Sequence, residues 1–282
     1  MKVGFVILTL NSERVIKACL ESVIGITSVD SHIVVVDNGS TDTTKEIISS
    51  VILKDNTTLK LICHDKDMGI SVSRNDGIKY IRKFDPEYYC ILDSDTVISE
   101  SALNILIDEM NTHKEYGLIG PKMATSSGVV QMSARSFPTF FEKICKGIPL
   151  SSIQKIGERI ENQAREEVNA ISCEVDYIMG ACWLIRPTAL DQVGGWDEKI
   201  FYGPDDAEYC IRMWKNGYSV AYCEKAQIIH EWQRLSKRKL FSKVNLEHIK
   251  GLLYMFKKHS YFFSTKRLKK SFPLLNREGK IR

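Results

Sequence analysis

Short apolar runs alternate with amphipathic helical patterns through the first third of the chain. The runs have the length and composition of buried strands, and they occupy residues 3–8, 32–37, 59–63 and 88–93. Helical spacing follows Ser12, a candidate N-cap, and recurs near 43–51, after Gly69 and from about Ser99. The alternation predicts an α/β fold in which helices cover both faces of a parallel sheet.

A different pattern begins after residue 111. Strands around a turn at 126–128 should precede largely helical residues at 139–170, and a long apolar segment follows at 175–187. A capped helix then ends at Gly217, because glycine is a common helix stop signal. The last two strands are expected at 219–223 and 226–230.

Charge is distributed unevenly along the chain. The whole chain has a net charge of +4. Residues 233–282 contain fifteen Lys or Arg and two Glu, a net charge of +13, so residues 1–232 carry +4 minus +13, or −9. No repeat or low-complexity linker divides the acidic part. We therefore expect one domain at 1–232, with halves at 1–111 and 112–232, followed by a basic helical tail.

The composition is that of a soluble globular protein. Hydrophobic residues make up 44% and charged residues 26% of the chain, and no apolar run approaches the roughly eighteen residues that a membrane span requires. The eight cysteines are scattered without a C-x-x-C pair. Reduced thiols in a cytoplasmic protein are expected.

Polar residues follow three of the four expected strands. The first strand ends at Thr9-Leu10-Asn11, the second at Asp37-Asn38-Gly39-Ser40 and the fourth at Asp93-Ser94-Asp95. Open α/β sheets bind ligands beyond the carboxyl ends of their strands, where such loops converge. The three loops therefore predict a binding site at one edge of the sheet.

Asp93 and Asp95 are separated by one small residue at the end of an apolar strand. In an extended chain their side chains leave on the same side, and two adjacent carboxylates repel unless a positive charge lies between them. Magnesium-like ions bind one or two carboxylates and complete their shell with water and phosphate oxygens. A solvated turn is the alternative, but the neighbouring polar loops favour a divalent-cation site.

Ordered segments of the chain resemble family 2 glycosyltransferases of the GT-A fold. They are VILTLNSE, VVVDNGSTD, DMGISVSRNDG, ILDSDT, VDYIMGACWLIRPTALDQVGGWDE, FYGPDDAEYCIRMWKNGY and AQIIH, and they cover residues 2 to about 231. The resemblance implies a Rossmann-like nucleotide-binding half with a mixed central sheet and an acceptor-binding half. GLIGPKM followed by GVVQMSARSFPT is similar to the rhamnosyltransferase-like branch that builds bacterial surface polysaccharides.

The resemblance also implies an activity and its partners. It implies inverting transfer of a sugar from dTDP-rhamnose or a UDP-sugar to a saccharide hydroxyl, with Mn²⁺ or Mg²⁺ as cofactor. The acceptor would be carried on a polyprenyl diphosphate lipid. A catalytically silent sugar-nucleotide-binding protein is the alternative.

Nucleotide-binding residues are carried over from the family by position. Its first two strand ends hold the nucleobase and ribose, and a glycine and an arginine bring a helix start close to the nucleotide. Asn38 stands where the family often has a second Asp. The alternative for Glu13 is a purely structural role, in which its charge favours the dipole of the helix that follows. The residues assigned to this role are Thr9, Leu10, Asn11, Glu13, Asp37, Asn38, Gly69, Arg74, Asp93 and Ser94.

Metal ligands are implied in the same way. Asp95 and His230 match the family's ligand positions, and Asp93 would bond the ribose or a metal-bound water as well as the ion. Without the resemblance, a histidine at the end of a strand is more often a core or surface residue. Glu231 is the alternative ligand beside it.

Inverting transfer requires a base that takes the proton of the acceptor hydroxyl. The resemblance implies Asp206 as the base, because it matches the Asp of the family's Glu-Asp pair, and Asp205 stands where the family usually has Glu. Capping and the helix dipole are the alternative explanation for carboxylates here, including Glu208. The donor and acceptor pocket is expected to include Gly180, Ala181, Trp183 and Trp196, because small residues admit a sugar and aromatic faces pack against it.

The basic tail predicts a helix with one apolar face. Its lysines suit anionic lipid, which would place the protein on the inner face of the plasma membrane. A helix packed on the body or a homodimer interface is the alternative. Nucleic acid is not an expected partner of the acidic body, and no G-x-G-x-x-G of a dehydrogenase follows the first strand. The apolar face comprises Phe241, Val244, Ile249, Leu252, Leu253 and Phe256.

Overall fold

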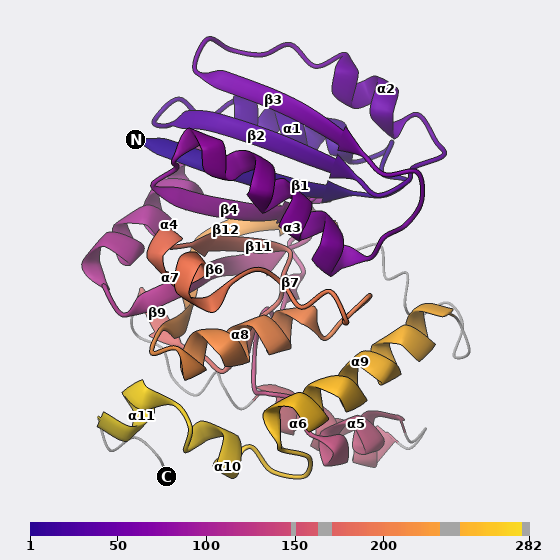
Figure 1. Cartoon of the computed structure of the whole chain (residues 1–282), viewed down its shortest axis with the longest axis vertical. Helices are drawn as coiled ribbons and strands as arrows, with labels where there is room; N and C mark the ends of the chain where they lie inside the picture. Colours follow the sequence, from indigo (N-terminus) through magenta and orange to yellow (C-terminus); the bar gives the residue numbers. More distant parts are fainter. Residues whose placement is uncertain (148–150, 163–170, 232–242, 278–282) are drawn as a thin grey trace.

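The structure is a computed structural model that describes residues 1–147, 151–162, 171–231 and 243–277. Its centre is a β-sheet in the order β3-β2-β1-β4-β11-β6-β12-β5, with β7 paired to β6 and β9 to β12 (Figure 1). The strands are β1 (Lys2–Thr9), β2 (Asp30–Asp37), β3 (Thr57–Cys63), β4 (Tyr88–Asp93), β5 (Thr96–Val97), β6 (Tyr116–Ala124), β7 (Val130–Gln131), β9 (Ser172–Glu174), β11 (Cys182–Ile185) and β12 (Ser219–His230). A separate pair is formed by β8 (Ala134–Arg135) and β10 (Tyr177–Ile178).

The sheet is mixed, and one short strand joins its two halves. β1, β2, β3 and β4 run parallel. β11 is antiparallel to β4 on one side and to β6 on the other, and β12 then runs parallel to β6. This architecture confirms the expected α/β fold with a mixed central sheet.

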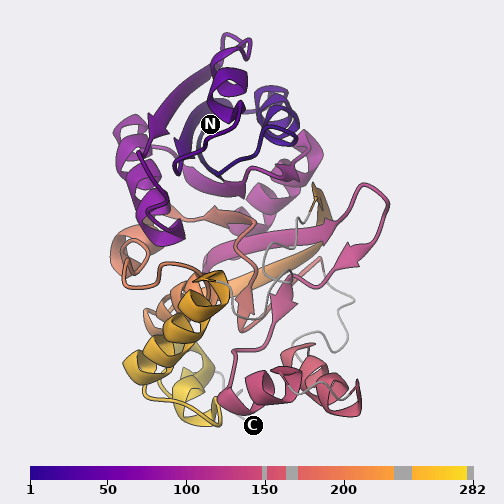
Figure 2. The ribbon, with the colours of Figure 1, turned by 90° about the vertical axis from the view of Figure 1, so that its right-hand side faces the viewer.

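Helices cover both faces of the sheet. One buried cluster includes residues of α1, α2 and α4, and a second includes residues of α3, α7, α8 and α9. The pair α5 and α6 lies at the end of the molecule opposite β3 (Figures 1 and 2). The helices are α1 (Ile16–Ile24), α2 (Thr44–Ser49), α3 (Ile70–Ile81), α4 (Glu100–Thr112), α5 (Phe140–Gly147), α6 (Ser151–Asn162), α7 (Pro187–Val193), α8 (Asp205–Lys215), α9 (Lys243–His259), α10 (Lys266–Lys269) and α11 (Pro273–Arg277).

Two local predictions were wrong. Ser12 does not cap α1 with its side chain, because its hydroxyl bonds Leu10 O and the Ser94 hydroxyl, and α1 begins at Ile16. The two strands expected at 219–223 and 226–230 are one continuous strand, β12, with an irregular register between Cys223 and Gln227. A bulge of this kind lets one strand change direction without ending.

Helix α9 packs against the body along one side. Met255 and Phe256 are buried in the same cluster as α8. The Glu208 carboxylate on α8, 1% exposed, accepts from Lys258 at 2.7 Å and from His259 at 3.1 Å. The domain boundary expected at residue 232 falls at the start of residues 232–242, which lie outside the described residues. Helix α9, which follows them, packs against the folded body.

The opposite side of α9 faces solvent. Leu246, Ile249 and Leu253 are 50%, 53% and 48% exposed. The apolar face expected for the tail is therefore divided, because Leu252 and Phe256 are buried while Ile249 and Leu253 are not. Phe241 lies outside the described residues. Among the helices that are described, none has the length and apolar character to cross a bilayer.

The sheet brings the predicted polar loops to one edge. β1 and β2 end side by side at Thr9 and Asp37, and Leu8 of β1 pairs with Asp93 at the end of β4. The last residue of β12, His230, pairs with Thr96 directly after the acidic loop. Register thus places strand ends from both halves of the sequence together.

Candidate active site

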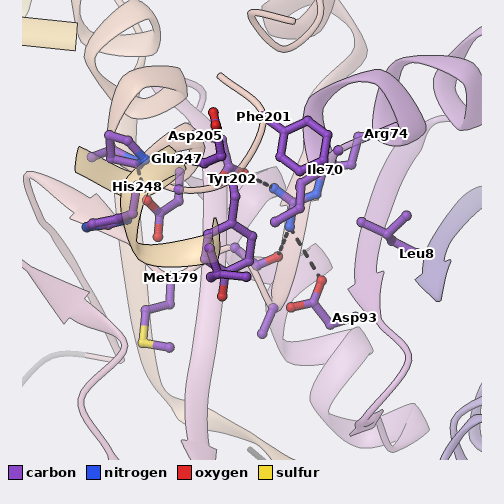
Figure 3. Close-up of a pocket in the computed structure, with 18 of the residues that line it drawn as sticks. Leu8, Ile70, Arg74, Asp93, Met179, Phe201, Tyr202, Asp205, Glu247 and His248 are labelled. Carbon is purple, nitrogen blue, oxygen red and sulfur yellow. Dashed lines mark hydrogen bonds and ion pairs between the residues drawn. The ribbon is translucent and has the colours of Figure 1, made fainter. Parts of the chain in front are cut away.

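A cavity of about 710 Å³ opens at this edge of the sheet. Its volume is in the range of small-molecule sites. Loops after β1, β2 and β4 form one side, and Tyr202, Glu247 and His248 lie across from Asp93 (Figure 3). Residues from both halves of the sheet and from α9 therefore enclose the same space.

Asp93, Asp95 and His230 form the cluster that can hold a metal ion. One ligand atom from each lies within 4.8 Å of the others. The Nε2 atom of His230 is 3.4 Å from an Asp95 oxygen, while its Nδ1 atom is 2.6 Å from Oε1 of Gln131. The amide oxygen accepts from Nδ1, so it orients the ring and turns Nε2 toward the carboxylates.

Arg74 links the acidic cluster to the first residue of α8. It is 2% exposed and donates to Asp205 at 2.6 Å, to the Gly180 carbonyl at 2.9 Å and to Asp93 at 3.4 Å (Figure 3). Its guanidinium lies 5.7 and 5.5 Å from the ring centres of Trp183 and Trp196, within cation–π range. Burial raises the pKa of Asp93 to about 6, although the Arg74 charge opposes that rise.

The three carboxylates of the α8 start have different environments. Asp205 is buried against Arg74. Glu208 faces α9, and despite burial its hydrogen bond with His259 and the charge of Arg212 lower its pKa to about 2. Asp206 lines the cavity, and burial together with the charge of Asp205 raises its pKa to about 6. Of these three carboxylates, Asp206 lines the cavity with a raised pKa, whereas Asp205 is paired with Arg74 and Glu208 is paired with α9.

The expected nucleotide-binding residues do not all reach the cavity. Thr9, Leu10, Asn38, Gly69, Arg74, Asp93 and Ser94 line it. The Asn11 side chain instead accepts from the Thr41 backbone at 2.9 Å, and Glu13 accepts from Thr43. Asp37 is fully buried and accepts from the Ser40 backbone. These last residues shape the loops behind the cavity.

Asn38 has a structural reason to differ from aspartate. Its side-chain nitrogen donates to Asp67 at 2.6 Å, and its oxygen accepts from the Met68 backbone at 2.8 Å. An aspartate here would place two carboxylates in contact, which is unfavourable. Asp67 itself lines the cavity.

Of the four residues expected in the donor and acceptor pocket, the two small ones line the cavity and the two tryptophans do not. Gly180 and Ala181 line the cavity, but a Cβ on Gly180 would lie 2.9 Å from the Arg74 guanidinium. Trp183 and Trp196 do not line it, because they are 0% and 3% exposed and stack on each other behind Arg74. Their indoles support the arginine from within the core.

Glycine is required at position 69 because the backbone at Phe201 lies close to it. It has a positive φ of 86°, and an added Cβ would meet the Phe201 carbonyl at 2.7 Å. Ile70, the first residue of α3, donates its backbone N–H to that same oxygen at 3.0 Å. The glycine therefore lets the start of α3 approach the loop that precedes α8.

Several cavity residues escaped the sequence analysis. Arg135 and Tyr177 lie on the small β8–β10 pair, Lys143 on α5, and His248 on α9. None belongs to a short motif with a chemical signature. The helical period of α9 could have placed His248 opposite the exposed apolar stripe, but not inside a site.

Comparison with known proteins places the chain in a family. A sequence model described as Glycosyl transferase family 2 matches residues 5–194. The chain belongs to glycosyl transferase family 2. It is therefore a glycosyltransferase, and the match includes the loops at Thr9, Asp37 and Asp93.

Two curated relatives of this family 2 glycosyltransferase are a rhamnosyltransferase and a polysaccharide synthase by their names. It is 22% identical over 236 residues to the N-acetylglucosaminyl-diphospho-decaprenol L-rhamnosyltransferase of Mycobacterium tuberculosis, covering 81% of this chain and 75% of that protein. It is 24% identical to the poly-beta-1,6-N-acetyl-D-glucosamine synthase of Staphylococcus epidermidis, covering 79% of this chain and 48% of the relative.

Solved structures share the fold at low sequence identity. A complex of GalNAc-T7 with UDP, GalNAc and Mn²⁺ has a TM-score of 0.67 at 14% identity, covering 96% of this chain and 53% of that one. TarS of S. aureus in complex with UDP has a TM-score of 0.55 at 18% identity, covering 81% and 60%. The glycosyltransferase thus spans a little over half the length of these structures.

Replacing Arg74 should destabilise the protein strongly. Arg74→Gln leaves the buried Asp205 carboxylate without its ion pair, and breaking such a pair costs about 3–5 kcal/mol. Urea denaturation would measure the free energy of unfolding. The matched control is Arg82→Gln, because Arg82 and Asp191 are 44% and 58% exposed and such pairs contribute at most about 1 kcal/mol. Equal losses in the two variants would contradict the role assigned to Arg74.

Proposed function

We propose that this glycosyltransferase is an inverting, metal-dependent enzyme that moves a sugar from a nucleoside diphosphate to a saccharide hydroxyl. One observation carries the proposal: a single cavity holds the Asp93, Asp95 and His230 cluster and also Asp206, whose pKa is about 6. The first set fits a cation that binds a diphosphate. Asp206 fits a base, and Arg74 fixes the loop between them.

The residues present fit Mn²⁺ or Mg²⁺. Two carboxylates and an imidazole are suitable ligands, and the hydrogen bond from His230 to Gln131 leaves Nε2 directed at the carboxylates. A bound divalent cation would neutralise the charge that develops on the leaving diphosphate. Glu231 is a weaker candidate, because its carboxylate accepts from the Ser126 backbone at 2.8 Å.

Asp206 supports the proton-transfer step. Its carboxylate takes the proton of the acceptor hydroxyl while the oxygen bonds to the anomeric carbon and the bond to the diphosphate breaks. A pKa near 6 allows the ionised form to dominate at neutral pH while keeping appreciable basicity. Asp205 acts indirectly, since its pair with Arg74 holds the start of α8 in place.

The donor nucleotide is proposed to lie over the ends of β1 and β2. Thr9, Leu10 and Asn38 offer backbone and side-chain groups for the base and ribose, while Asn11, Glu13 and Asp37 hold those loops. Gly69 and Ser94 also line this part of the cavity. Either a UDP-sugar or dTDP-rhamnose is compatible with this arrangement.

A lipid-linked saccharide is the proposed acceptor. The support is the relative from Mycobacterium tuberculosis, whose name specifies a diphospho-decaprenol acceptor and rhamnose transfer. The outer side of α9 suits the same setting, because Leu246, Ile249 and Leu253 are exposed beside Lys250 and Lys257. Such a face binds anionic bilayers, with each basic residue contributing about 1 kcal/mol. We therefore place the protein on the inner face of the plasma membrane.

Metal-dependent nucleotide binding tests the donor site. Calorimetric titrations with UDP, dTDP and GDP should detect one that binds in Mn²⁺ and at least about tenfold more weakly in EDTA. Asp95→Asn should abolish that difference, whereas Glu231→Gln should keep it. Hydrolysis of the corresponding nucleotide-sugar would exclude a silent binding protein. Mn²⁺-independent binding in the native protein would refute the metal assignment.

Replacing Asp206 should separate catalysis from binding. Asp206→Asn should lower turnover by about 10²–10⁴-fold and leave nucleotide affinity unchanged. The native rate should fall as pH decreases through about 6, because protonated Asp206 cannot accept a proton.

Ionised Asp206 also lowers the folding stability above that pH, so the Asp206→Asn variant should melt at a higher temperature than the native protein at neutral pH. The exposed Asp55→Asn serves as control, and full turnover without Asp206 would discard this base.

Vesicle flotation of the full chain tests the membrane face. The protein should float with vesicles containing phosphatidylglycerol and not with pure phosphatidylcholine. Replacing Leu246, Ile249 and Leu253 together by Ser should reduce flotation, since these side chains are already exposed and the fold does not depend on them. Ile52→Ser, at a position 88% exposed on the other half, is the control. Unchanged flotation of the α9 variant would reject this face.

A further inference from the structure

Basic side chains lie across the cavity from the metal-binding cluster. Arg135 and Lys143 line the cavity, and Lys146 follows one turn after Lys143 on α5. His248, which Figure 3 shows opposite Asp93, is close enough to Lys143 and Lys146 for their charges to act on it. We call Arg135, Lys143 and Lys146 the far-side cationic cluster.

The carboxylates that pair with this cluster are buried behind it. Glu161 accepts from Arg135 at 2.9 Å and from Lys146 at 2.8 Å, and Glu142 lies 3.2 Å from Lys143. The two Glu side chains are 9% and 1% exposed, whereas the basic ones are 22–33% exposed. The carboxylates thus hold the cations from behind, and Arg135 and Lys143 contribute to the cavity wall.

The positive and negative charges of this group lie at different depths. Among the described residues of the cluster, three cations face two carboxylates, Glu142 and Glu161. Glu247 also lines this side of the cavity, but its carboxylate accepts from Lys250 at 2.7 Å. Ionised Asp206, which lies near Arg135, supplies a third negative charge, so the positive potential is confined to the Lys143 and Lys146 end of the cluster. A protein cavity with low-dielectric walls strengthens the effect of that local potential on a ligand.

His248 responds to that positive potential. Burial, followed by the charges of Lys143 and Lys146, lowers the pKa of His248 to about 4. The imidazole is consequently neutral at physiological pH and offers a hydrogen bond without adding charge. Its ring nitrogen lies near the Gly203 backbone, beside the loop that carries Asp206.

The proposed donor leaves this side of the cavity unused. Its diphosphate is assigned to the Asp93 and Asp95 cluster, and its base and ribose to the ends of β1 and β2. We propose that the far-side cationic cluster, with Lys143 as its main contact, binds a phosphate or diphosphate ester carried by the acceptor saccharide. This inference rests on the proposed function and names the chemical class of its acceptor.

The position of Arg135 connects the cluster to the base. Arg135 is near enough to Asp206 to oppose the rise in the pKa of that carboxyl. Repulsion between Asp206 and an acceptor phosphate favours the Lys143 end of the cluster for the phosphate. The acceptor sugar would then span from Lys143 to Asp206, which presents its hydroxyl to the base.

Binding of prenyl diphosphates without metal tests the proposal. The full-length protein, in EDTA, would be titrated calorimetrically with geranyl diphosphate, inorganic pyrophosphate and geraniol. Geranyl diphosphate should bind and geraniol should not. Equal affinity for pyrophosphate would identify the phosphate groups alone as the ligand, and weaker pyrophosphate binding would show that the lipid chain adds contacts. Absence of binding by either diphosphate would overturn the proposal.

Variants locate the binding and separate it from the donor site. Lys143→Gln should weaken geranyl diphosphate binding by about tenfold, and Lys143→Arg should retain most of it. The matched control is Lys155→Gln, an exposed lysine on the neighbouring α6. Asp95→Asn should leave this metal-free binding unchanged while losing Mn²⁺-dependent nucleotide binding.

The outcomes distinguish the two proposals. If Lys143→Gln binds geranyl diphosphate as the native protein does, or if it instead weakens nucleotide binding in Mn²⁺, the far-side subsite is refuted and the proposed function is unaffected. If Asp95→Asn keeps full Mn²⁺-dependent nucleotide binding, the metal assignment fails while the subsite stands.

Discussion

The site depends on one buried guanidinium. Arg74 is 2% exposed and reaches the end of β4, the carbonyl of Gly180 and the start of α8. A buried charge is tolerated only when paired and hydrogen-bonded, so each of these partners must be in place for Arg74 to be accommodated. The requirement couples the nucleotide-binding half to the half that carries Asp206. Trp183 and Trp196 restrict the arginine further by packing beside it.

Helix α9 connects catalysis with the surroundings of the molecule. Its inner side contributes His248 to the cavity, its buried residues hold it to α8, and its outer side presents an apolar stripe. Helix α9 thus contacts the cavity, the core and the solvent, which explains why its apolar residues and lysines do not separate into two simple faces. A bilayer bound to the outer side would lie next to the cavity that the proposed lipid-linked acceptor would enter.

The sequence predicted the sheet and the acidic loop because strand ends carry a local signal. Asp93 and Asp95 follow a strand of apolar residues, and their pairing with a cation follows from charge alone. His230 needed the family resemblance, since only the register of β12 brings it there. The resemblance favoured Asp206 over Asp205 as the base, but the ion pair between Asp205 and Arg74 could not be read from the sequence, because the two residues are 131 positions apart. Arg135 lies on a strand of two residues, and Lys143 lies on a helix that the sequence predicted but whose place beside the cavity only the tertiary structure shows.

The antiparallel strand β11 has a consequence for how the chain can be divided. It covers the edge of β4 through Tyr89, Cys90, Ile91 and Leu92, all of them buried. A fragment ending at residue 111 would keep the nucleotide loops but expose this apolar edge, which invites pairing with other chains. The two halves that the sequence suggests thus share one sheet, and a fragment of the first half would lack the strand that protects its edge.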